Sequence, residues 1–430
     1  MTDERTNGQA AMLTMVGVSH RNAPLSVRER FAIPADELPS VRHEVAERFG
    51  AGAIVATCNR LELYVPDEHE PGELAGFLCE AALADADLGE RYLLPRRDAE
   101  AVSHLYAVAA GIDSMVIGES EILGQVRSSF AATVSAGADT ALLSRLFHTA
   151  IRLGRRARTE TAIGHGALSI SSIAAQQARE LVPDLASAAV LVIGAGEAGR
   201  LAAASLVDHG IGSIAVSNRT QSKAQALAEE LEGRSVPYGS LGAELSAADV
   251  VIAATDAPEP VLNSGRVASA LVRREGAPQL IIDIGVPRAC DPAVAAVPGV
   301  TYRDIDDLQE IAAAHAHARA AEVQAVERLV EEETGRFLEW WEHLQVAPTI
   351  AALSERAEQL RLGELERTLR RLDLDEGERE RVEAMTKALV RRILHDPIAA
   401  LRERGDRDVY VDAVRHLFRL DEPADPPAAP

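Results

Sequence analysis

The spacing of apolar residues divides the first part of the chain into strands and helices. Apolar runs over Met12–Ser19 and Ala53–Tyr64 have the short, alternating character of β-strands. Residues 98–158 show helical spacing instead, with breaks near Gly111, Gly118 and Gly137. We therefore predict an α+β domain over residues 12–160.

Four apolar runs in the middle of the chain alternate with segments of helical length. They are AVLVIG (189–194), SIAVSN (213–218), DVVIAAT (249–255) and QLIIDIG (279–285). Strands separated by helices form βαβ crossovers and a parallel sheet. The pattern predicts a Rossmann-like domain over residues 161–304.

The last third of the chain has helical periodicity. Residues 305–346 are rich in Ala, Glu and Arg and contain no Pro. A single helix of ~40 residues would extend ~60 Å, so we expect it to link domains. Residues 347–420 are predicted to form an all-helical dimerisation domain. Its apolar stripe consists of Leu362, Leu365, Leu369, Leu372, Met385, Leu389 and Ile393. Residues 1–11 and 421–430 have no apolar periodicity and are predicted to be a disordered leader and tail. The predicted fold class is thus α/β multidomain.

Composition limits the cellular location and the kinds of ligand that we expect for this protein. Three cysteines in 430 residues cannot form a disulfide framework, no apolar run reaches the ~18 residues of a membrane span, and the first residues are polar. We expect a cytoplasmic protein, without a metal site because no metal-ligand spacing occurs. The net charge is −22, and only Lys223 and Lys387 are lysines. This acidic surface suggests a halophilic protein or simply a soluble acidic one, and it is unfavourable for binding nucleic acid.

A glycine-rich loop follows the first strand of the predicted Rossmann-like domain. VIGAGEAG places Gly194, Gly196 and Gly199 in a GxGxxG pattern. The first Gly permits a tight turn, the second lets a pyrophosphate approach the backbone, and the third lets helix and strand pack closely. Packing alone is the alternative explanation. We predict dinucleotide binding by Gly194, Ala195, Gly196, Glu197, Ala198 and Gly199.

The end of the second strand indicates which dinucleotide binds. NAD sites usually carry an Asp or Glu there, but this chain has Asn218, Arg219 and Thr220, followed by Lys223. A guanidinium can hold a 2′-phosphate that a carboxylate would repel. The cofactor is therefore predicted to be NADPH. An exposed Arg at a strand end is the alternative.

One cysteine has polar neighbours. Cys79 and Cys290 are expected to be small buried hydrophobes, but Cys58 lies in TCNR, where Arg60 would favour the reactive thiolate. GIDSMVIGESEILGQV (111–126) supplies further polar side chains. These are Ser114, Glu119, Ser120, Glu121 and Gln125. His104 on the preceding helical stretch could act as an acid or base, or could be a satisfied, partly buried His.

Several motifs occur in an order that resembles one family. They are GVSHRNAPLSVRE, ATCNRLELY, IGESEILGQV, RRARTETAI, VIGAGEAG, SNRT, IDIGVPR and ILHDP. Their order and content resemble the glutamyl-tRNA reductases, which open the C5 route to tetrapyrroles, over nearly the whole chain.

The resemblance implies specific roles. Cys58 would be the nucleophile and His104 an activity-linked residue or proton donor. Glutamate contacts would fall on Thr57, Asn59, Arg60, Ser114, Glu119, Ser120, Glu121 and Gln125. Glu121 departs from the family, because many relatives have Gln at this position. The implied partners are glutamyl-tRNA and a second copy in a V-shaped homodimer, and the resemblance leaves room for a transient contact with the downstream aminomutase.

The implied reaction explains why a thiol and a nucleotide domain occur together. Cys58 would attack the ester of glutamyl-tRNA, and NADPH would reduce the resulting thioester to glutamate-1-semialdehyde. Arginines at 152, 155, 156 and 158, and at 391, 392, 402 and 404, could contact tRNA or form salt bridges. Two other readings are open: a dehydrogenase resembling shikimate dehydrogenase, or a non-catalytic NADP-binding dimer.

Overall fold

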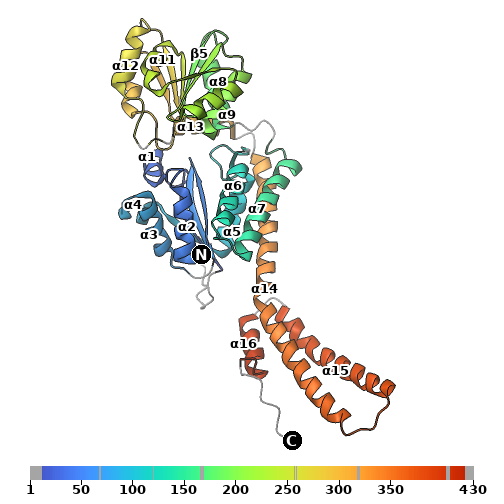
Figure 1. Ribbon diagram of the computed structural model, residues 1–430. Helices are drawn as coiled ribbons and strands as arrows, with labels where there is room; N and C mark the ends of the chain where they lie inside the picture. The colour runs from blue at the N-terminus through green and yellow to red at the C-terminus, as the bar shows by residue number, and fades with distance from the viewer. Residues whose placement is uncertain are drawn as a thin grey trace. The chain divides into compact units, whose positions relative to one another are not determined.

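The computed structural model describes residues 12–66, 69–119, 121–164, 169–255, 257, 259–316, 320–402 and 407–421. The chain divides into two compact units, Met1–Thr334 and Gly335–Pro430. Figure 1 shows the elements of each unit along the chain. The predicted leader (1–11), most of the predicted tail and Ser120 lie outside the described residues.

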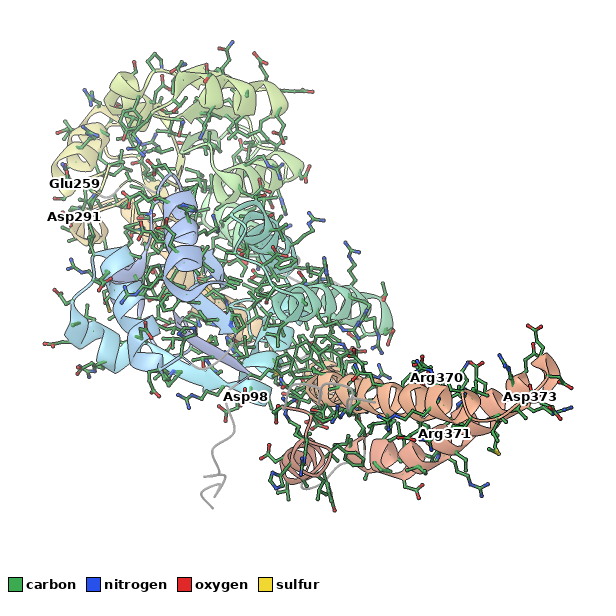
Figure 2. All side chains as sticks on the ribbon, turned by 60° about the horizontal axis from the view of Figure 1, so that its bottom comes forward. Asp98, Glu259, Asp291, Arg370, Arg371 and Asp373 are labelled. Carbon is green, nitrogen blue, oxygen red and sulfur yellow. The ribbon has the colours of Figure 1, made fainter. Side chains whose placement is uncertain are left out.

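The first unit begins with an antiparallel sheet in the order β2-β3-β1-β4. The strands are β1 (Leu13–Ser19), β2 (Ala53–Thr57), β3 (Arg60–Pro66) and β4 (Leu94–Arg97). The helices that accompany them are α1 (Leu25–Arg28), α2 (Leu38–Phe49), α3 (Pro71–Ala82), α4 (Ala86–Tyr92), α5 (Asp98–Ala110), α6 (Glu121–Ser135) and α7 (Ala141–Glu160). The apolar faces of the strands pack on these helices, with Leu63 and Ile54 fully buried. Asp98, labelled in Figure 2, accepts hydrogen bonds from the N–H groups of Met12 and Leu13 and so joins α5 to the start of β1.

The segment predicted as one strand, Ala53–Tyr64, is a β-hairpin. Strands β2 and β3 pair antiparallel, with Thr57 opposite Arg60. Cys58 and Asn59 form the two-residue turn between them. Two-residue hairpin turns usually contain Gly, and this turn contains none. The sequence therefore contains no signal that the strand pattern is interrupted at Cys58 and Asn59. The polar cluster is thus at the tip of a hairpin rather than at the edge of one strand.

The second half of this unit is a parallel sheet in the order β10-β9-β8-β5-β6-β7. Its strands are β5 (Ala189–Ile193), β6 (Ser213–Ser217), β7 (Arg234–Val236), β8 (Val250–Ala253), β9 (Gln279–Asp283) and β10 (Val300–Arg303). The accompanying helices are α8 (Ile170–Leu181), α9 (Glu197–Asp208), α10 (Gln221–Glu230), α11 (Leu241–Ala247), α12 (Ser264–Arg273) and α13 (Ile305–Ala316). This strand order is that of the doubly wound Rossmann fold, in which ligands bind where the order reverses, here between β5 and β8. The predicted Rossmann-like fold is confirmed.

The helix α13 belongs to the Rossmann core, although its residues were predicted to begin a linking helix. Ile305 and Leu308 are buried in the same apolar cluster as Ile173 of α8 and Val190 of β5. Figure 1 shows α8, α9 and α13 grouped beside β5. The start of the predicted linker therefore serves the nucleotide domain.

The long helix is α14 (Ala320–Leu369), which has 50 residues. The predicted end at Val346 falls inside it, and Pro348 lies within the helix. Proline removes one hydrogen bond and usually disrupts a helix, but the residues after it favour helix and form ion pairs one turn apart, such as Glu358–Arg361 and Glu364–Arg367.

The second unit is all helical, as predicted. After α14 come α15 (Glu376–Arg402) and α16 (Arg407–Leu417). Figure 2 shows Arg370, Arg371 and Asp373 where α14 gives way to α15. Much of the predicted apolar stripe is exposed in the single chain: Met385 is 55%, Leu389 52% and Ile393 67% exposed. Among the described helices, none has the length and apolar content needed to cross a membrane.

Candidate active site

Backbone and side-chain contacts hold the hairpin turn that carries Cys58. The N–H of Asn59 donates to Thr57 Oγ1 at 3.1 Å, and the N–H of His20 donates to the carbonyl of Asn59 at 3.0 Å. Arg28 Nη1 donates to Asn59 Oδ1 at 2.9 Å and to the carbonyl of Cys58 at 3.3 Å. The turn is therefore fixed from both sides, and Cys58 stays half-buried on it.

A cavity of about 60 Å³ lies against this turn. Of the predicted substrate-binding residues, the structure brings together Thr57, Cys58, Asn59, Arg60, Ser114, Glu119, Glu121 and Gln125 in the cavity wall. The opposite wall comes from the Rossmann domain, through Ser171, Glu197 and Ala198. Glu197 and Ala198 belong to the glycine-rich loop and the start of α9. The cysteine and the nucleotide loop thus share one cavity.

A buried polar network lies next to the turn. Glu62 Oε1 accepts hydrogen bonds from Arg60 Nη1 at 2.7 Å and, in the tautomer that carries the Nε2 proton, from His104 Nε2 at 2.8 Å. Glu62 Oε2 accepts from the hydroxyl of Tyr64 at 2.8 Å. Burial raises the pKa of the Glu62 carboxyl, but Arg60 and His104 outweigh it and hold that pKa below the ordinary value of 4.5. Glu62 is therefore ionised, and its carboxylate accepts hydrogen bonds from Arg60, His104 and Tyr64.

Glu62 fits because the facing position on β1 is a glycine. Gly17 is paired with Glu62 across the sheet. A Cβ at Gly17 would lie 2.7 Å from Glu62 Cγ and 2.7 Å from the carbonyl of Leu61. The glycine of the GVSHR motif therefore leaves the space that the Glu62 side chain fills.

Arg60 does not activate the thiol in the way the sequence suggested. Its guanidinium pairs with Glu62 and with Asp113, which Nη1 reaches at 3.3 Å. Burial, with smaller contributions from Glu119 and Glu121, raises the pKa of Cys58 to about 12, while Arg28 is the cation that opposes the rise. The expected thiolate activation by Arg60 is wrong, because two carboxylates already neutralise that guanidinium.

Two cavity carboxyls have raised pKa values. Burial raises the pKa of Glu119 to about 7, with a smaller rise from Glu121, and the hydroxyl of Ser114 opposes the rise. Burial likewise raises the pKa of Glu121, and the hydroxyls of Ser169 and Ser171 oppose the rise. The cavity thus contains a group able to gain or lose a proton near neutral pH.

His104 lies outside the cavity wall. It is on α5 with its side chain 8% exposed, and it contacts Glu62 at 2.8 Å and Asp113 at 3.7 Å. The expected role as a proton donor beside the thiol does not match this placement. His104 instead supports Glu62 and, through it, Arg60.

The glycine-rich loop has the geometry that a dinucleotide requires. Gly194 has a φ of 110°, and a Cβ there would lie 2.1 Å from the carbonyl of Ala254. A Cβ at Gly199 would lie 2.9 Å from the carbonyl of Gly194, whereas one at Gly196 would meet no atom within 4 Å. Gly196 also caps α9 without a side-chain hydrogen bond. The space and the N–H groups at the start of α9 suit a pyrophosphate.

The residues predicted to select the nucleotide follow β6 beside this loop. Asn218 Oδ1 accepts from the N–H of Ala195 at 3.4 Å, and Asn218 Nδ2 donates to the carbonyl of Thr220 at 3.1 Å. Asn218 therefore ties the glycine-rich loop to the segment that carries Arg219. Lys223 lies in the first turn of α10. No carboxylate occupies positions 218–220.

Most of the first arginine run serves the fold. Arg156 pairs with Glu160 at 2.9 Å and with Glu333 of α14 at 2.7 Å. Arg158 donates to the carbonyls of Ala109, Gly154 and Glu119. The salt-bridging alternative therefore holds for Arg156 and for Arg152, whose Nη2 lies 3.7 Å from Glu333 Oε2, whereas Arg158 bonds to backbone carbonyls. In the second run, residue 404 lies outside the described residues.

The structure adds residues that the sequence reasoning missed. Arg28, Glu62 and Asp113 all contact predicted site residues. Glu62 had a signal, since it is a carboxylate inside the apolar run LELY. Arg28 had little signal in the sequence, because charged residues such as Arg28 and Glu29 are usually on the surface.

The Rossmann order, the open loop at Gly196 and the shared cavity define an oxidoreductase that uses a nicotinamide dinucleotide. Family models match three successive parts of the chain: "Glutamyl-tRNAGlu reductase, N-terminal domain" over residues 16–161, "Shikimate / quinate 5-dehydrogenase" over 176–311, and "Glutamyl-tRNAGlu reductase, dimerisation domain" over 325–420.

Full-length relatives identify the family. The chain is 37% identical over 418 residues to the glutamyl-tRNA reductase of Trichlorobacter lovleyi, covering 95% of this chain and 96% of that protein. It is 39% identical over 413 residues to that of Rubrobacter xylanophilus, with the coverage again 95% and 96%. The solved glutamyl-tRNA reductase from Methanopyrus kandleri is 35% identical, covers 96% of this chain and 100% of its own, and gives a TM-score of 0.52. The chain belongs to the glutamyl-tRNA reductase family.

Proposed function

We propose that this protein reduces the glutamyl group of glutamyl-tRNA to glutamate-1-semialdehyde with NADPH, releasing tRNA, through a thioester on Cys58. Family membership supports the overall reaction. The cavity supports the mechanism, because Cys58 and the Glu197–Ala198 start of α9 line the same space.

The thiol makes the reduction possible in two steps. Cys58 Sγ bonds to the carbonyl carbon of the aminoacyl ester, the bond from that carbon to the ribose oxygen breaks, and the oxygen leaves as a hydroxyl of tRNA. When bound, NADPH supplies a hydride to the thioester carbon. With one added proton, the resulting hemithioacetal releases the aldehyde and returns the thiol. Each step avoids the direct reduction of a carboxylate.

The cavity carboxyls handle the protons of this sequence. The Cys58 thiol keeps its proton near neutral pH, because burial raises its pKa to about 12. Glu119, with a pKa of about 7, is suited to take the thiol proton and pass it to the departing ribose oxygen. Arg60, already paired with Glu62 and Asp113, presents a rigid guanidinium to an incoming glutamyl carboxylate.

A single-turnover experiment tests the proposal. Enzyme mixed with glutamyl-tRNA labelled in the amino acid, without NADPH, should carry label on the Cys58 peptide and release free tRNA. Adding NADPH should discharge that label as glutamate-1-semialdehyde, and deuterated NADPH should place deuterium on the aldehyde carbon. Release of the aldehyde with no trapped label at any time point would exclude the thioester.

Arg219→Asp is expected to weaken NADPH binding far more than NADH binding. The guanidinium would hold the 2′-phosphate of NADPH, and a carboxylate would repel it. The expected loss for NADPH is about 100-fold, which corresponds to ~2.7 kcal/mol. Titrating both nucleotides by fluorescence checks this. Equal losses for the two would contradict a phosphate clamp, and NADH serves as the internal control.

The rival readings are less well supported. The shikimate dehydrogenase-type match covers residues 176–311 only, whereas the reductase relatives span 95% of the chain. A non-catalytic dimer does not explain the thiol in the nucleotide cavity. A cytoplasmic location, adaptation to high salt and contact with an aminomutase stay predictions.

The second unit is proposed to form a homodimer through its exposed apolar stripe. The dimerisation-domain match covers residues 325–420, and Met385, Leu389 and Ile393 are each more than half exposed. Such exposure is costly unless a partner covers it.

Leu389→Asp together with Ile393→Asp should therefore convert the dimer to monomer. Placing carboxylates in an apolar interface leaves unpaired buried charges. Sedimentation or light scattering at micromolar concentration measures the mass. Glu380→Ala, at an exposed position of the same helix, is the matched control. An unchanged dimer in the double variant would place the interface elsewhere.

A further inference from the structure

We propose that Arg28 is a positioning residue that couples docking of the Rossmann domain to the turn that carries Cys58. The proposal deepens the proposed function and rests on it for its purpose, but the contacts that carry it are independent of the reaction. Arg28 lies at the end of α1, in the SVRE part of a motif that the proposed chemistry does not use.

On one side, Arg28 holds the hairpin turn. Its Nη1 donates to Asn59 Oδ1 at 2.9 Å and to the Cys58 carbonyl at 3.3 Å. Its Nε donates to the carbonyl of Ala23 at 3.3 Å. The side chain is only 3% exposed, so the guanidinium has little freedom to find other partners.

On the other side, Arg28 is held by the Rossmann domain. Its Nη2 donates to Asp306 Oδ1 at 2.5 Å, and Asp306 Oδ2 accepts from the N–H of Leu25 at 3.2 Å. Asp306 is in the first turn of α13, whose neighbours Ile305 and Leu308 are buried in the Rossmann core. The counter-ion of a buried cation in one domain is therefore supplied by the other domain.

The Arg28 guanidinium contacts both the Cys58 turn and Asp306, so separating the two domains changes its contact with the turn. If the Rossmann domain moves away, Arg28 loses Asp306 and becomes a buried cation without a counter-ion, which is strongly unfavourable. It would then turn towards water and release the Cys58 carbonyl and Asn59. When the domain docks, the guanidinium is fixed against the turn again. Docking thereby sets the position of the thiol.

Substrate entry gives this coupling a use. The docked cavity has a volume of about 60 Å³, far below the ~300 Å³ or more of typical small-molecule sites. Its walls come from both domains, so the glutamyl ester and the nucleotide need the walls to separate before they can enter. A thiol that is correctly placed only on docking would react when the acceptor and the nucleotide are both enclosed.

A second ion pair between the same domains provides a control. Arg288 Nε and Nη2 donate to Glu29 Oε1 and Oε2, each at 2.9 Å. In addition, the N–H of Arg288 donates to Glu29 Oε1 at 2.6 Å. This pair also fastens the domains together, but among the hydrogen bonds of the described residues it makes none to the Cys58 turn. Breaking this pair removes one fastening between the domains while both partners of the Arg28–Asp306 pair stay in the sequence.

The test measures alkylation of Cys58 by iodoacetamide at pH 8 in the full chain, with the modified peptide identified by mass. The charged groups around the thiol are Arg60, Glu119, Glu121 and Glu197 in the cavity wall and Arg28 behind the turn. Arg28→Gln should slow alkylation about tenfold, the change in thiolate fraction that one pKa unit produces, and Arg28→Lys should restore part of the rate. Asp306→Asn should also slow it, and should add little to Arg28→Gln in the double variant.

The sign of the Asp306→Asn effect separates coupling from the alternatives. Simple loss of a nearby negative charge, or simple opening of the cavity, would speed alkylation. Glu29→Gln leaves the Arg28–Asp306 pair in place, so it should slow alkylation less than Asp306→Asn does. Asp306→Asn reacting as fast as wild type, or Arg28→Gln having no effect, overturns the proposal. Thermal unfolding confirms that each variant is folded. Because the assay contains no tRNA or nucleotide, its outcome does not depend on whether the thioester proposal holds.

Discussion

Cys58→Ser is expected to lower the reduction of glutamyl-tRNA by at least ~10³-fold, the scale of losing a catalytic nucleophile. Serine has nearly the same size, so it fits the turn between Thr57 and Asn59 without disturbing the cavity. Its hydroxyl is a much weaker nucleophile than a thiol, and the described part of the cavity wall supplies no histidine to activate it. Trapped label should disappear along with turnover, while NADPH affinity stays unchanged because the glycine-rich loop is intact.

A matched thiol isolates the effect of position. Cys79→Ser removes a cysteine that is buried on α3 and should leave both label trapping and turnover near wild type. Rates are measured by quenched-flow with labelled substrate. Equal trapping in wild type and Cys58→Ser would mean that the acyl group is held elsewhere, and the thioester mechanism would fail even though family membership stands.

Glu62→Ala is expected to lower the free energy of unfolding of the first domain by ~3–5 kcal/mol, because it leaves the fully buried Arg60 short of its main counter-ion. The hydroxyl of Tyr64 and the ring of His104 lose their acceptor as well. Hydrogen exchange of the β1 and β3 amides reports local stability. Turnover should fall too, since Arg60 would no longer be held at the cavity.

The charge of Glu62 also predicts a pH dependence. Its pKa in the folded protein lies below the ordinary value of 4.5, so its contribution to stability is fully present above about pH 4.5 and is lost as the pH falls below that value. Glu62→Gln should remove this dependence while keeping the shape of the side chain. Glu44→Ala on the exposed face of α2 should change stability by no more than ~0.5 kcal/mol. Protection of the β1 amides that is the same in Glu62→Ala and wild type would show that Asp113 alone suffices for Arg60.

The Rossmann half could be predicted because its central strands are buried on both faces. AVLVIG is a continuous apolar run and QLIIDIG contains the apolar run LII, which is how such strands appear in sequence. The strands β7 and β10 were missed because they have three and four residues and lie at the two edges of the sheet. An edge strand needs fewer apolar residues, so its pattern is weak.

The residues of the site could be predicted from the sequence, but the contacts between their side chains could not. Sequence neighbours such as Thr57, Cys58 and Asn59 could be grouped by adjacency and by resemblance, and the structure places them together at the cavity. The pairing of Arg60 with Glu62 depends on two residues of one strand pointing to the same face, next to a glycine on the neighbouring strand. The Arg28–Asp306 contact joins positions 278 apart in sequence. No local pattern encodes such a contact.

The bare backbone at Gly17 has a consequence for anyone who would transplant this catalytic hairpin onto another scaffold. Grafting residues 57–62 alone would leave the acid facing a methyl group or larger on almost any host strand, and the acid would be forced out. The arginine at the position of Arg60 would lose this partner and turn to solvent. The part that must be transferred therefore includes both strands, with a glycine kept at the position that faces the acid.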